Sequence, residues 1–184
     1  MKRKTLIGAV VLVGTFFAFA ATAAPLGKTV FVSSSLHTGD LNGIAGADKI
    51  CQGLANNAGL AGLYKAWISI PTSSPAQTRF VKSTVPYFRV DGIKVAENWE
   101  DLIDGELDAP INLTENNVVL SGTDKVMTST FANGYSSAGK NCNNWTSSSI
   151  HSNTLMGEYL DDYRWTGSCF SLCSIPSRLY CFAQ

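Results

Sequence analysis

The sequence has no excess of basic residues. Its 184 residues include 14 Lys and Arg and 14 Asp and Glu, so the formal net charge is zero at pH 7. Proteins that bind nucleic acid through its phosphates depend on clustered positive charge, and no such cluster is present. After residue 24 no apolar run approaches the roughly 20 residues that a membrane-spanning helix needs. We therefore expect no nucleic-acid partner, and no membrane span beyond the first residues.

The sequence is also poor in the groups that build most catalytic and metal sites. It has two histidines, His37 and His151, both among serines and threonines. A nucleophile and its base need a third group that orients the base, and no segment has the strand–turn–helix context of a hydrolase serine. There is no Cys-x-x-Cys pair, and the closest spacing is Cys169-x-x-x-Cys173, which argues against zinc. We expect a protein that is not an enzyme.

The first recognisable pattern is an export signal. Residues 2–4 are basic, Leu6–Ala21 is apolar, and Ala21-Thr22-Ala23 supplies the small side chains that signal peptidase requires. Cleavage after Ala23 avoids a product with Pro25 in the disfavoured first position, and predicts a signal peptide over residues 1–23 and one domain over 24–184. Loss of three bases leaves 11 basic and 14 acidic residues. We expect a secreted, periplasmic or cell-surface protein.

All five cysteines lie in the mature chain, four of them after residue 140. Export leads to an oxidising compartment, so two disulfide bonds and one odd thiol are expected. The helical spacing of apolar residues around Cys51 turns this cysteine inward, which fits a buried disulfide. The spacing alone leaves the pairing open.

Short periodic segments predict an α+β domain. Alternation of apolar and polar residues indicates strands, and a helical period from Ile44 to Ala58, ended by Gly59 and Gly62, indicates a helix. Asp91-Gly92 between two strand-like runs predicts a two-residue hairpin. The strands are predicted at 28–34, 64–70, 87–90, 93–96, 118–120 and 178–184, with short helices at 75–81 and 98–103. The last strand is expected to pair with the first.

Between these elements, residues 121–168 are dominated by Ser, Thr, Asn and Gly and have no sustained period. Irregular segments of this length in a compact domain are functional or disordered. Disordered segments usually lack aromatic residues, whereas this one contains Trp145, Tyr159, Tyr163 and Trp165. We expect ordered loops that disulfide bonds hold in place.

Five motifs occur in a characteristic order: Ala66-Trp67-Ile68, Asp108–Asn112, Ser121–Asp124, Asn141–Thr146 and Arg178–Phe182. With the elements above, this order resembles the C-type-lectin-like fold. It resembles more closely the endostatin-like bacterial domain of unknown function of surface proteins in spirochaetes and other bacteria. The resemblance covers nearly the whole mature chain. It implies two helices that flank a mostly antiparallel sheet, paired terminal strands and a long loop region.

The resemblance also implies a disulfide pairing. The helix cysteine Cys51 would be bonded to Cys181 of the final strand, and Cys142 to Cys173 across the loop region. Cys169 is then the odd cysteine. A bond between Cys142 and Cys169, or a bond between two molecules, stays open.

For function, the resemblance implies a secreted binding module without catalysis. Relatives of the endostatin-like family are implicated in attachment to host matrix proteins and complement regulators, so we expect adhesin-like recognition of an extracellular protein or glycan. Two alternatives are a calcium-dependent carbohydrate-binding lectin and a surface receptor whose loop region varies between strains. The sequence leaves the ligand and the oligomeric state open.

Calcium is the one cofactor that the sequence brings into question. Asp104, Glu106 and Asp108 belong to a run of acidic residues without an intervening base, and carboxylate oxygens are calcium ligands. The loop and strand motifs that hold calcium in true C-type lectins correspond here to Ala109–Asn112 and Asn143-Asn144-Trp145, which lack the required acid. We favour a solvated acidic face and expect no cofactor.

The candidate ligand site lies between Gly157 and Thr166. Tyrosine, tryptophan and arginine are enriched at binding hot spots because they bring large contact areas with few rotamers to fix. We expect Tyr159 and Tyr163 to be exposed, while Trp165 fits a ligand site and a secondary core equally well. The candidate ligand-binding residues are Tyr159, Asp161, Asp162, Tyr163, Arg164 and Trp165.

Overall fold

The structure is a computed structural model that describes residues 27–184. The predicted signal peptide over residues 1–23 lies outside the described residues. Within the described part, no helix combines the length and the apolar character needed to cross a membrane.

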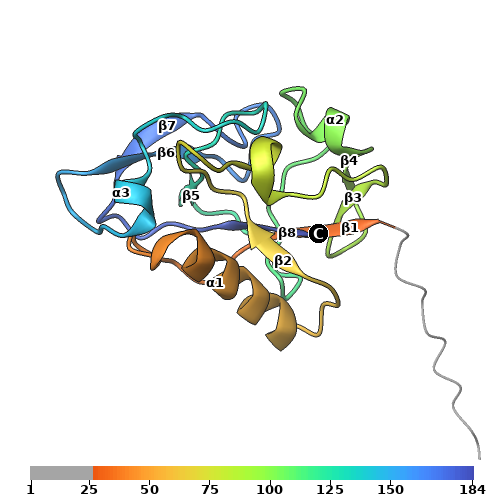
Figure 1. Ribbon diagram of the computed structural model, residues 1–184. Helices are drawn as coiled ribbons and strands as arrows, with labels where there is room; N and C mark the ends of the chain where they lie inside the picture. The colour runs from red at the N-terminus through yellow and green to blue at the C-terminus, as the bar shows by residue number, and fades with distance from the viewer. Residues whose placement is uncertain (1–26) are drawn as a thin grey trace, which may run out of the picture.

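Five strands form the larger sheet, in the order β2-β8-β1-β3-β4 (Figure 1). The first and last strands pair antiparallel, with Phe31 opposite Cys181, which confirms the predicted pairing of the terminal strands. The remaining pairs are antiparallel except that of β1 with β3. The fold is therefore α+β with a mostly antiparallel sheet. The strands are β1 (Lys28–Val32), β2 (Tyr64–Ala66), β3 (Tyr87–Arg89), β4 (Lys94–Ala96) and β8 (Tyr180–Ala183).

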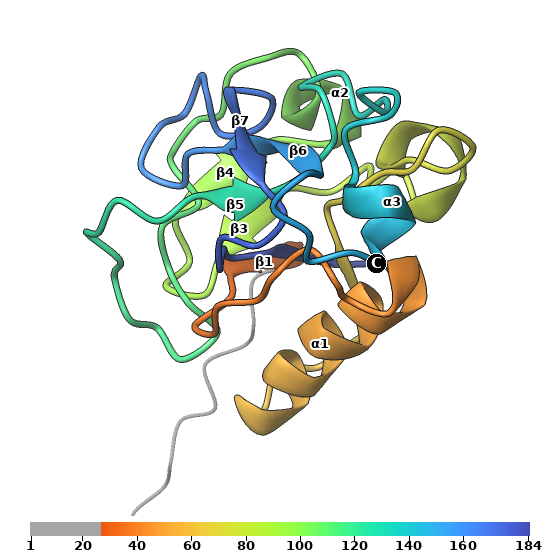
Figure 2. The ribbon, with the colours of Figure 1, turned by 90° about the vertical axis from the view of Figure 1, so that its left-hand side faces the viewer.

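The longest helix of the described residues, α1 (Gly43–Asn57), packs against this sheet through small side chains. It buries Ala47, Cys51 and Ala55, which confirms that Cys51 points inward. Figures 1 and 2 show α1 on one side of the sheet and β5, β6 and β7 on the other. The other predicted helices are single turns, η1 (Pro75–Arg79) and α2 (Trp99–Leu102). The expected pair of flanking helices is thus one long helix and short turns.

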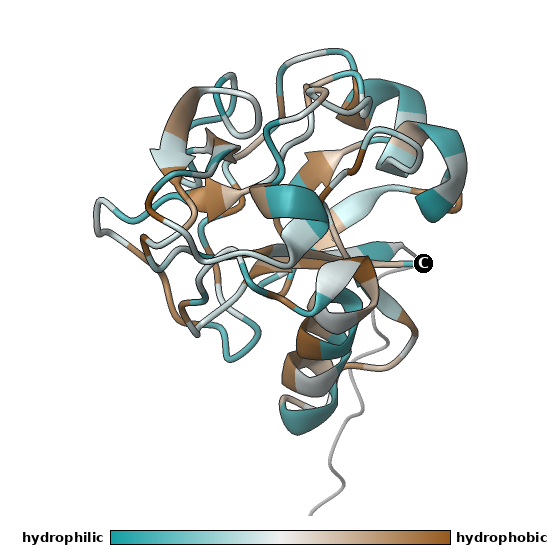
Figure 3. Cartoon of the chain, turned by 60° about the vertical axis from the view of Figure 1, so that its left-hand side comes forward, coloured by the Kyte–Doolittle hydropathy of each residue, from teal (hydrophilic) through white to brown (hydrophobic). Residues whose placement is uncertain are grey.

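The alternation predicted for the first strand divides the core into two layers. Val30 and Val32 belong to the cluster on one face of the sheet, and Phe31 belongs to the cluster on the other, beside Cys51. The first layer is rich in aromatic rings, and the centroids of Trp67 and Trp165 lie 4.9 Å apart. Figure 3 shows that α1 is banded in hydrophobic and hydrophilic residues, as expected for a helix with one buried side.

Three details of the predicted strands are wrong. The second strand ends at Ala66 instead of residue 70, although Trp67 is buried as expected. The hairpin between β3 and β4 has four connecting residues, and the Arg89 amide donates to the Ile93 carbonyl. Residues 118–120 form no strand, because Val119 makes only an isolated bridge to Leu113.

Two of the three strands of a second sheet lie within residues 121–168, which were predicted to consist of loops, and the third follows directly. This sheet has the order β5-β6-β7, with β5 (Val126–Met127), β6 (Asn153–Gly157) and β7 (Cys169–Leu172). Gly157 is required at the end of β6, because a Cβ atom there would overlap the carbonyl group of Trp165. A short turn, α3 (Cys142–Trp145), precedes β6. The region is ordered, as expected, but it contains regular structure that the sequence does not reveal.

Candidate ligand-binding surface

The loop after β6 divides the predicted ligand-binding residues between the core and the surface. Tyr163 is 70% exposed, as expected, whereas Tyr159 is only 1% exposed. The prediction that Tyr159 is exposed is therefore wrong. Trp165 is buried too, and its ring packs against Trp67 and Tyr180. The physical reason is that the loop folds back on itself: the Glu158 amide donates to the Arg164 carbonyl at 3.0 Å, which brings the residues on either side of the turn inward.

Asp161 shapes this turn. Its Oδ1 atom accepts hydrogen bonds from the backbone amides of Tyr163, at 3.0 Å, and Arg164, at 2.6 Å. Its Oδ2 atom forms a salt bridge with the Arg164 guanidinium at 2.8 Å. The amide of Arg164, followed by its side chain and charge, lowers the pKa of Asp161. Asp162 is half-buried, and its carbonyl accepts from the Leu107 amide. Asp161 therefore orders the loop that carries Tyr163 outward.

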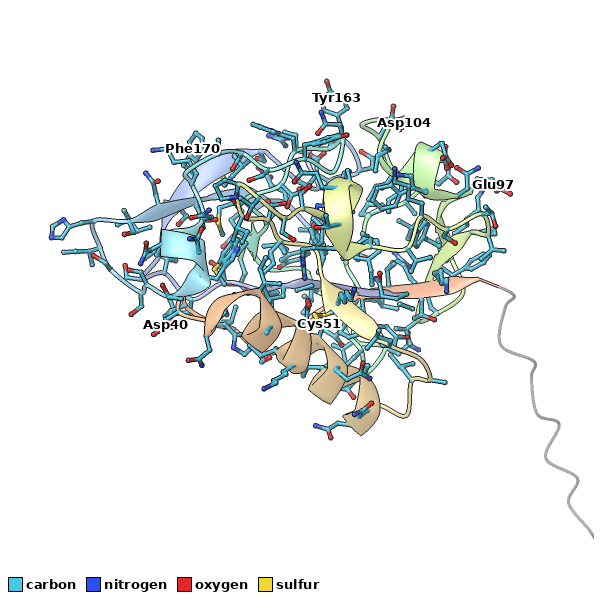
Figure 4. All side chains as sticks on the ribbon, viewed as in Figure 1. Asp40, Cys51, Glu97, Asp104, Tyr163 and Phe170 are labelled. Carbon is cyan, nitrogen blue, oxygen red and sulfur yellow. A yellow bond between two sulfur atoms is a disulfide. The ribbon has the colours of Figure 1, made fainter. Side chains whose placement is uncertain are left out.

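Four aromatic side chains between residues 131 and 170 are exposed, and we call them the aromatic surface. Tyr163 is joined by Phe170 of β7, which is 60% exposed, and by Tyr135 and Phe131, which are 50% and 46% exposed. Tyr163 and Phe170 both lie on the side of the molecule away from α1 in Figure 4, where Tyr163 is near Asp104 and Phe170 is farther along that side, toward α3. Phe131, Tyr135 and Phe170 were not predicted. Their signal in the sequence is the presence of large aromatic residues in polar segments without a core pattern.

The aromatic surface borders a depression of about 370 Å³. Phe131 and Tyr163 both line it, with Arg164 and Asp104 among the polar residues around them. The Thr166 hydroxyl donates to the Thr130 carbonyl at 2.7 Å and thereby ties the loop of Tyr163 to the turn that carries Phe131. That turn is closed by the bridge between Thr130 and Ser136. The depression is thus formed by segments that are hydrogen-bonded to one another.

The charged groups behind this depression neutralise one another. Glu158 accepts a hydrogen bond from Ser168 at 2.6 Å and forms salt bridges with Lys125, at 3.1 Å, and Arg164, at 3.8 Å. The Ser168 hydrogen bond, together with the two cations, lowers the pKa of Glu158. The arrangement favours an uncharged or weakly charged contact at the aromatic surface.

The acidic residues considered for calcium do not come together. Asp108 forms a salt bridge with Lys94 at 3.0 Å, so the negative charge of Asp108 is already balanced. Asp104 lies at the edge of the depression, and its Oδ1 atom accepts from the Glu106 amide at 3.1 Å. Over residues 27–184, no group of three or more His, Cys, Asp or Glu side chains is arranged to hold a metal ion.

The cysteines form two disulfide bonds. Cys51 is bonded to Cys181 and Cys142 to Cys173, the pairs that the family resemblance implies, while Cys169 in β7 is a half-buried free thiol. The second bond closes the segment of 31 residues that carries Tyr163, Phe170 and the turn α3. The bond therefore restrains the loops of the candidate surface.

One contact resembles part of a catalytic pair. The Ser35 hydroxyl and the His37 Nε2 atom lie 2.8 Å apart, and burial lowers the pKa of His37. In the described part of the chain, no carboxylate is hydrogen-bonded to the His37 ring, so the third member of a triad is missing there. His151 is exposed at a distant position in the sequence.

Comparison with protein-family models gives a match. A family model described as "Protein of unknown function (DUF1554)" matches residues 34–161, more than two thirds of the chain. No curated protein matches the chain.

Proposed function

The chain belongs to the DUF1554 family, whose description assigns no function, and we propose from its geometry that it is an exported, non-catalytic binding module. The proposed ligand is an extracellular protein or glycan, held by the aromatic surface. The observation that carries the proposal is that Phe131 and Tyr163, both about half-exposed or more, line one depression on segments that are hydrogen-bonded to each other, with Tyr135 and Phe170 also exposed.

Physical chemistry supports binding at this position. Exposed aromatic rings next to a depression offer large apolar contact areas and lose little rotamer entropy when a ligand fixes them. The loops are held by the Cys142–Cys173 bond and by the hydrogen bond from Thr166 to Thr130. Prior restraint lowers the entropy that binding costs, which is a recurrent property of loops that recognise ligands on a rigid scaffold.

The proposal also includes a fold type and a cellular location. The paired terminal strands, the bond between α1 and β8, and the long loop region support a C-type-lectin-like fold. Two disulfide bonds support an oxidising compartment, and so a secreted, periplasmic or cell-surface location. The calcium-dependent lectin is the second candidate, and it would need calcium ligands other than the set Asp104, Glu106 and Asp108, which does not come together.

The test is a binding screen of the protein against immobilised glycans and purified matrix proteins, with calcium and with chelator. The informative variant is Phe131→Ala combined with Tyr163→Ala. Its matched control is Leu63→Ala, which truncates an exposed apolar residue in the connection between α1 and β2. We expect a ligand that binds the control as well as the unchanged protein, with at least about tenfold weaker binding to the double variant.

Two results would contradict the proposal. The aromatic surface is not the ligand site if the double variant binds every ligand as well as the control. The protein is not a binding module of this class if neither glycans nor matrix proteins bind it. Binding that requires calcium would favour the lectin instead.

A further inference from the structure

A second depression, with different lining residues from the one beside Phe131 and Tyr163, lies beside the turn α3. It has a volume of about 480 Å³, and its lining is almost entirely polar. Four asparagines, one lysine and one histidine contribute to it: Lys140, Asn141, Asn143, Asn144, His151 and Asn153. None of the described residues that line it is acidic. The depression therefore offers amide groups and positive charge without a competing carboxylate.

The backbone of α3 is left-handed. Cys142, Asn143, Asn144 and Trp145 have φ angles of 51°, 54°, 56° and 66°, a conformation that residues other than glycine adopt singly and rarely in succession. Asparagine tolerates it best, which accounts for the two middle residues. Cysteine and tryptophan gain nothing from it locally, so tertiary contacts must impose it on them.

The contacts that impose this turn are identifiable. The Cys142–Cys173 bond holds its first residue, and the buried Trp145 holds its last by donating its indole N–H to the Ser69 carbonyl at 2.9 Å. The Asn141 side chain accepts from the Asn144 amide at 3.0 Å. Between these anchors, Asn143 and Asn144 are exposed and line the depression. The backbone that carries their side-chain amides is consequently held in place before a ligand binds.

Lys140 contributes a positive charge to the lining of this depression. Among residues 27–184 it takes part in no salt bridge, whereas Lys94, Lys125 and Arg164 are all paired. Its ammonium nitrogen lies 5.9 Å from the ring centroid of Phe170, an exposed member of the aromatic surface. Lys140 thus lines the depression together with Asn143 and Asn144, and its ammonium group also lies over the ring of Phe170.

We propose that this depression binds an acidic sugar unit, a monosaccharide that carries a carboxylate. Lys140 would attract the carboxylate. Asn143 and Asn144 would exchange hydrogen bonds with hydroxyl groups, because an amide both donates and accepts as adjacent hydroxyls do. The ring of Phe170 would pack against the C–H groups of the sugar or of its neighbour. The inference deepens the proposed function by naming a ligand class, and it rests on the protein being a binding module.

The experiment is an NMR titration of the protein with four probes: N-acetylneuraminic acid, glucuronic acid, glucose and inorganic phosphate. The two acidic sugars distinguish a terminal sialic acid from a uronic acid as the source of the carboxylate. Glucose tests the hydroxyl groups alone, and phosphate tests the charge alone. We expect at least one acidic sugar to bind about tenfold more tightly than glucose and phosphate, with shifts at Asn143 and Asn144.

Two variants assign the site. Lys140→Gln should abolish the preference for the acidic sugar over glucose, while the matched charge control Lys82→Gln, at an exposed lysine elsewhere, should keep it. Asn143→Gly removes an exposed side-chain amide yet suits the left-handed backbone, so it should weaken binding at least about fivefold with an unchanged melting temperature. This variant separates loss of the ligand contact from loss of the turn.

Failure of both acidic sugars to bind, equal binding of phosphate, or unchanged binding in Lys140→Gln would each overturn the inference. If the screen still yields a ligand that is lost with Phe131→Ala and Tyr163→Ala, the proposed function stands without it. If that screen also fails, both fall.

Discussion

Cys51 in α1 is bonded to Cys181 in β8, 130 residues later in the chain, and their Cα atoms lie 5.4 Å apart. The bond fastens the long helix to the strand that lies between β2 and β1. It thereby closes nearly the whole domain into one loop, inside which the bond between Cys142 and Cys173 closes a shorter one.

We expect the outer bond to stabilise the domain more than the inner one. Chain-entropy reasoning assigns roughly 5 kcal/mol to a loop of the outer length and roughly 4 kcal/mol to the inner. Urea unfolding of Cys51→Ala/Cys181→Ala should therefore show the larger loss, with Cys142→Ala/Cys173→Ala as its matched partner. A larger loss from the inner pair would mean that chain closure is not what these bonds contribute.

Cys169 should be the one thiol that reacts with a maleimide in the native, unreduced protein. It is free and half-buried, whereas the other four cysteines are in disulfide bonds. Mass spectrometry of unreduced peptides should recover Cys142 with Cys173. A peptide that joins Cys142 to Cys169, or a disulfide-linked dimer, would contradict this arrangement.

Tyr180→Phe should leave the free energy of unfolding unchanged or raise it by up to about 1 kcal/mol. The Tyr180 hydroxyl is buried and has no hydrogen-bond partner within the described residues, and burial raises its pKa well above the ordinary value. Removing an unsatisfied buried hydroxyl relieves a desolvation cost while the ring keeps its contact with Trp165. Destabilisation on thermal unfolding would show that the hydroxyl has a partner.

Stability should fall as the pH is lowered through neutrality, and His37 should contribute to the fall. Burial lowers the pKa of His37 in the folded protein, so the unfolded chain binds the proton more readily. The folded state is then favoured fully above the ordinary pKa of about 6.5 and loses stability as the pH drops below it. His37→Gln should flatten the dependence of the melting temperature on pH between about 7.5 and 5.5, whereas His151→Gln, at an exposed position, should not. Equal slopes in both variants would refute this role.

The parts of the fold that could be predicted are those set by local periodicity. The alternation of Val30, Phe31 and Val32 gives the two faces of β1, and the helical spacing around Cys51 gives the buried side of α1. β6 could not be predicted, because Asn153–Gly157 has no alternating pattern and becomes a strand through its pairing with β5 and β7.

The candidate site was predictable only in part. Tyr159 and Tyr163 have similar sequence surroundings, yet one is buried and the other exposed. The turn that separates them depends on Asp161 accepting the backbone amides two and three residues later, a local arrangement that composition alone does not specify. Phe131 lies beside Tyr163 at one depression only because the Thr166–Thr130 hydrogen bond joins two segments that are far apart in the sequence.

This difference between two tyrosines gives the most direct test of the aromatic surface as the ligand site. The measurement is the affinity for a ligand identified in the screen, with the melting temperature recorded for the same samples of Tyr163→Ala and Tyr159→Ala. We expect Tyr163→Ala to lose at least about tenfold in affinity at an unchanged melting temperature. Tyr159→Ala should lose about 3–5 kcal/mol of folding stability, as truncation of a buried large aromatic does. Full affinity in Tyr163→Ala would contradict the account.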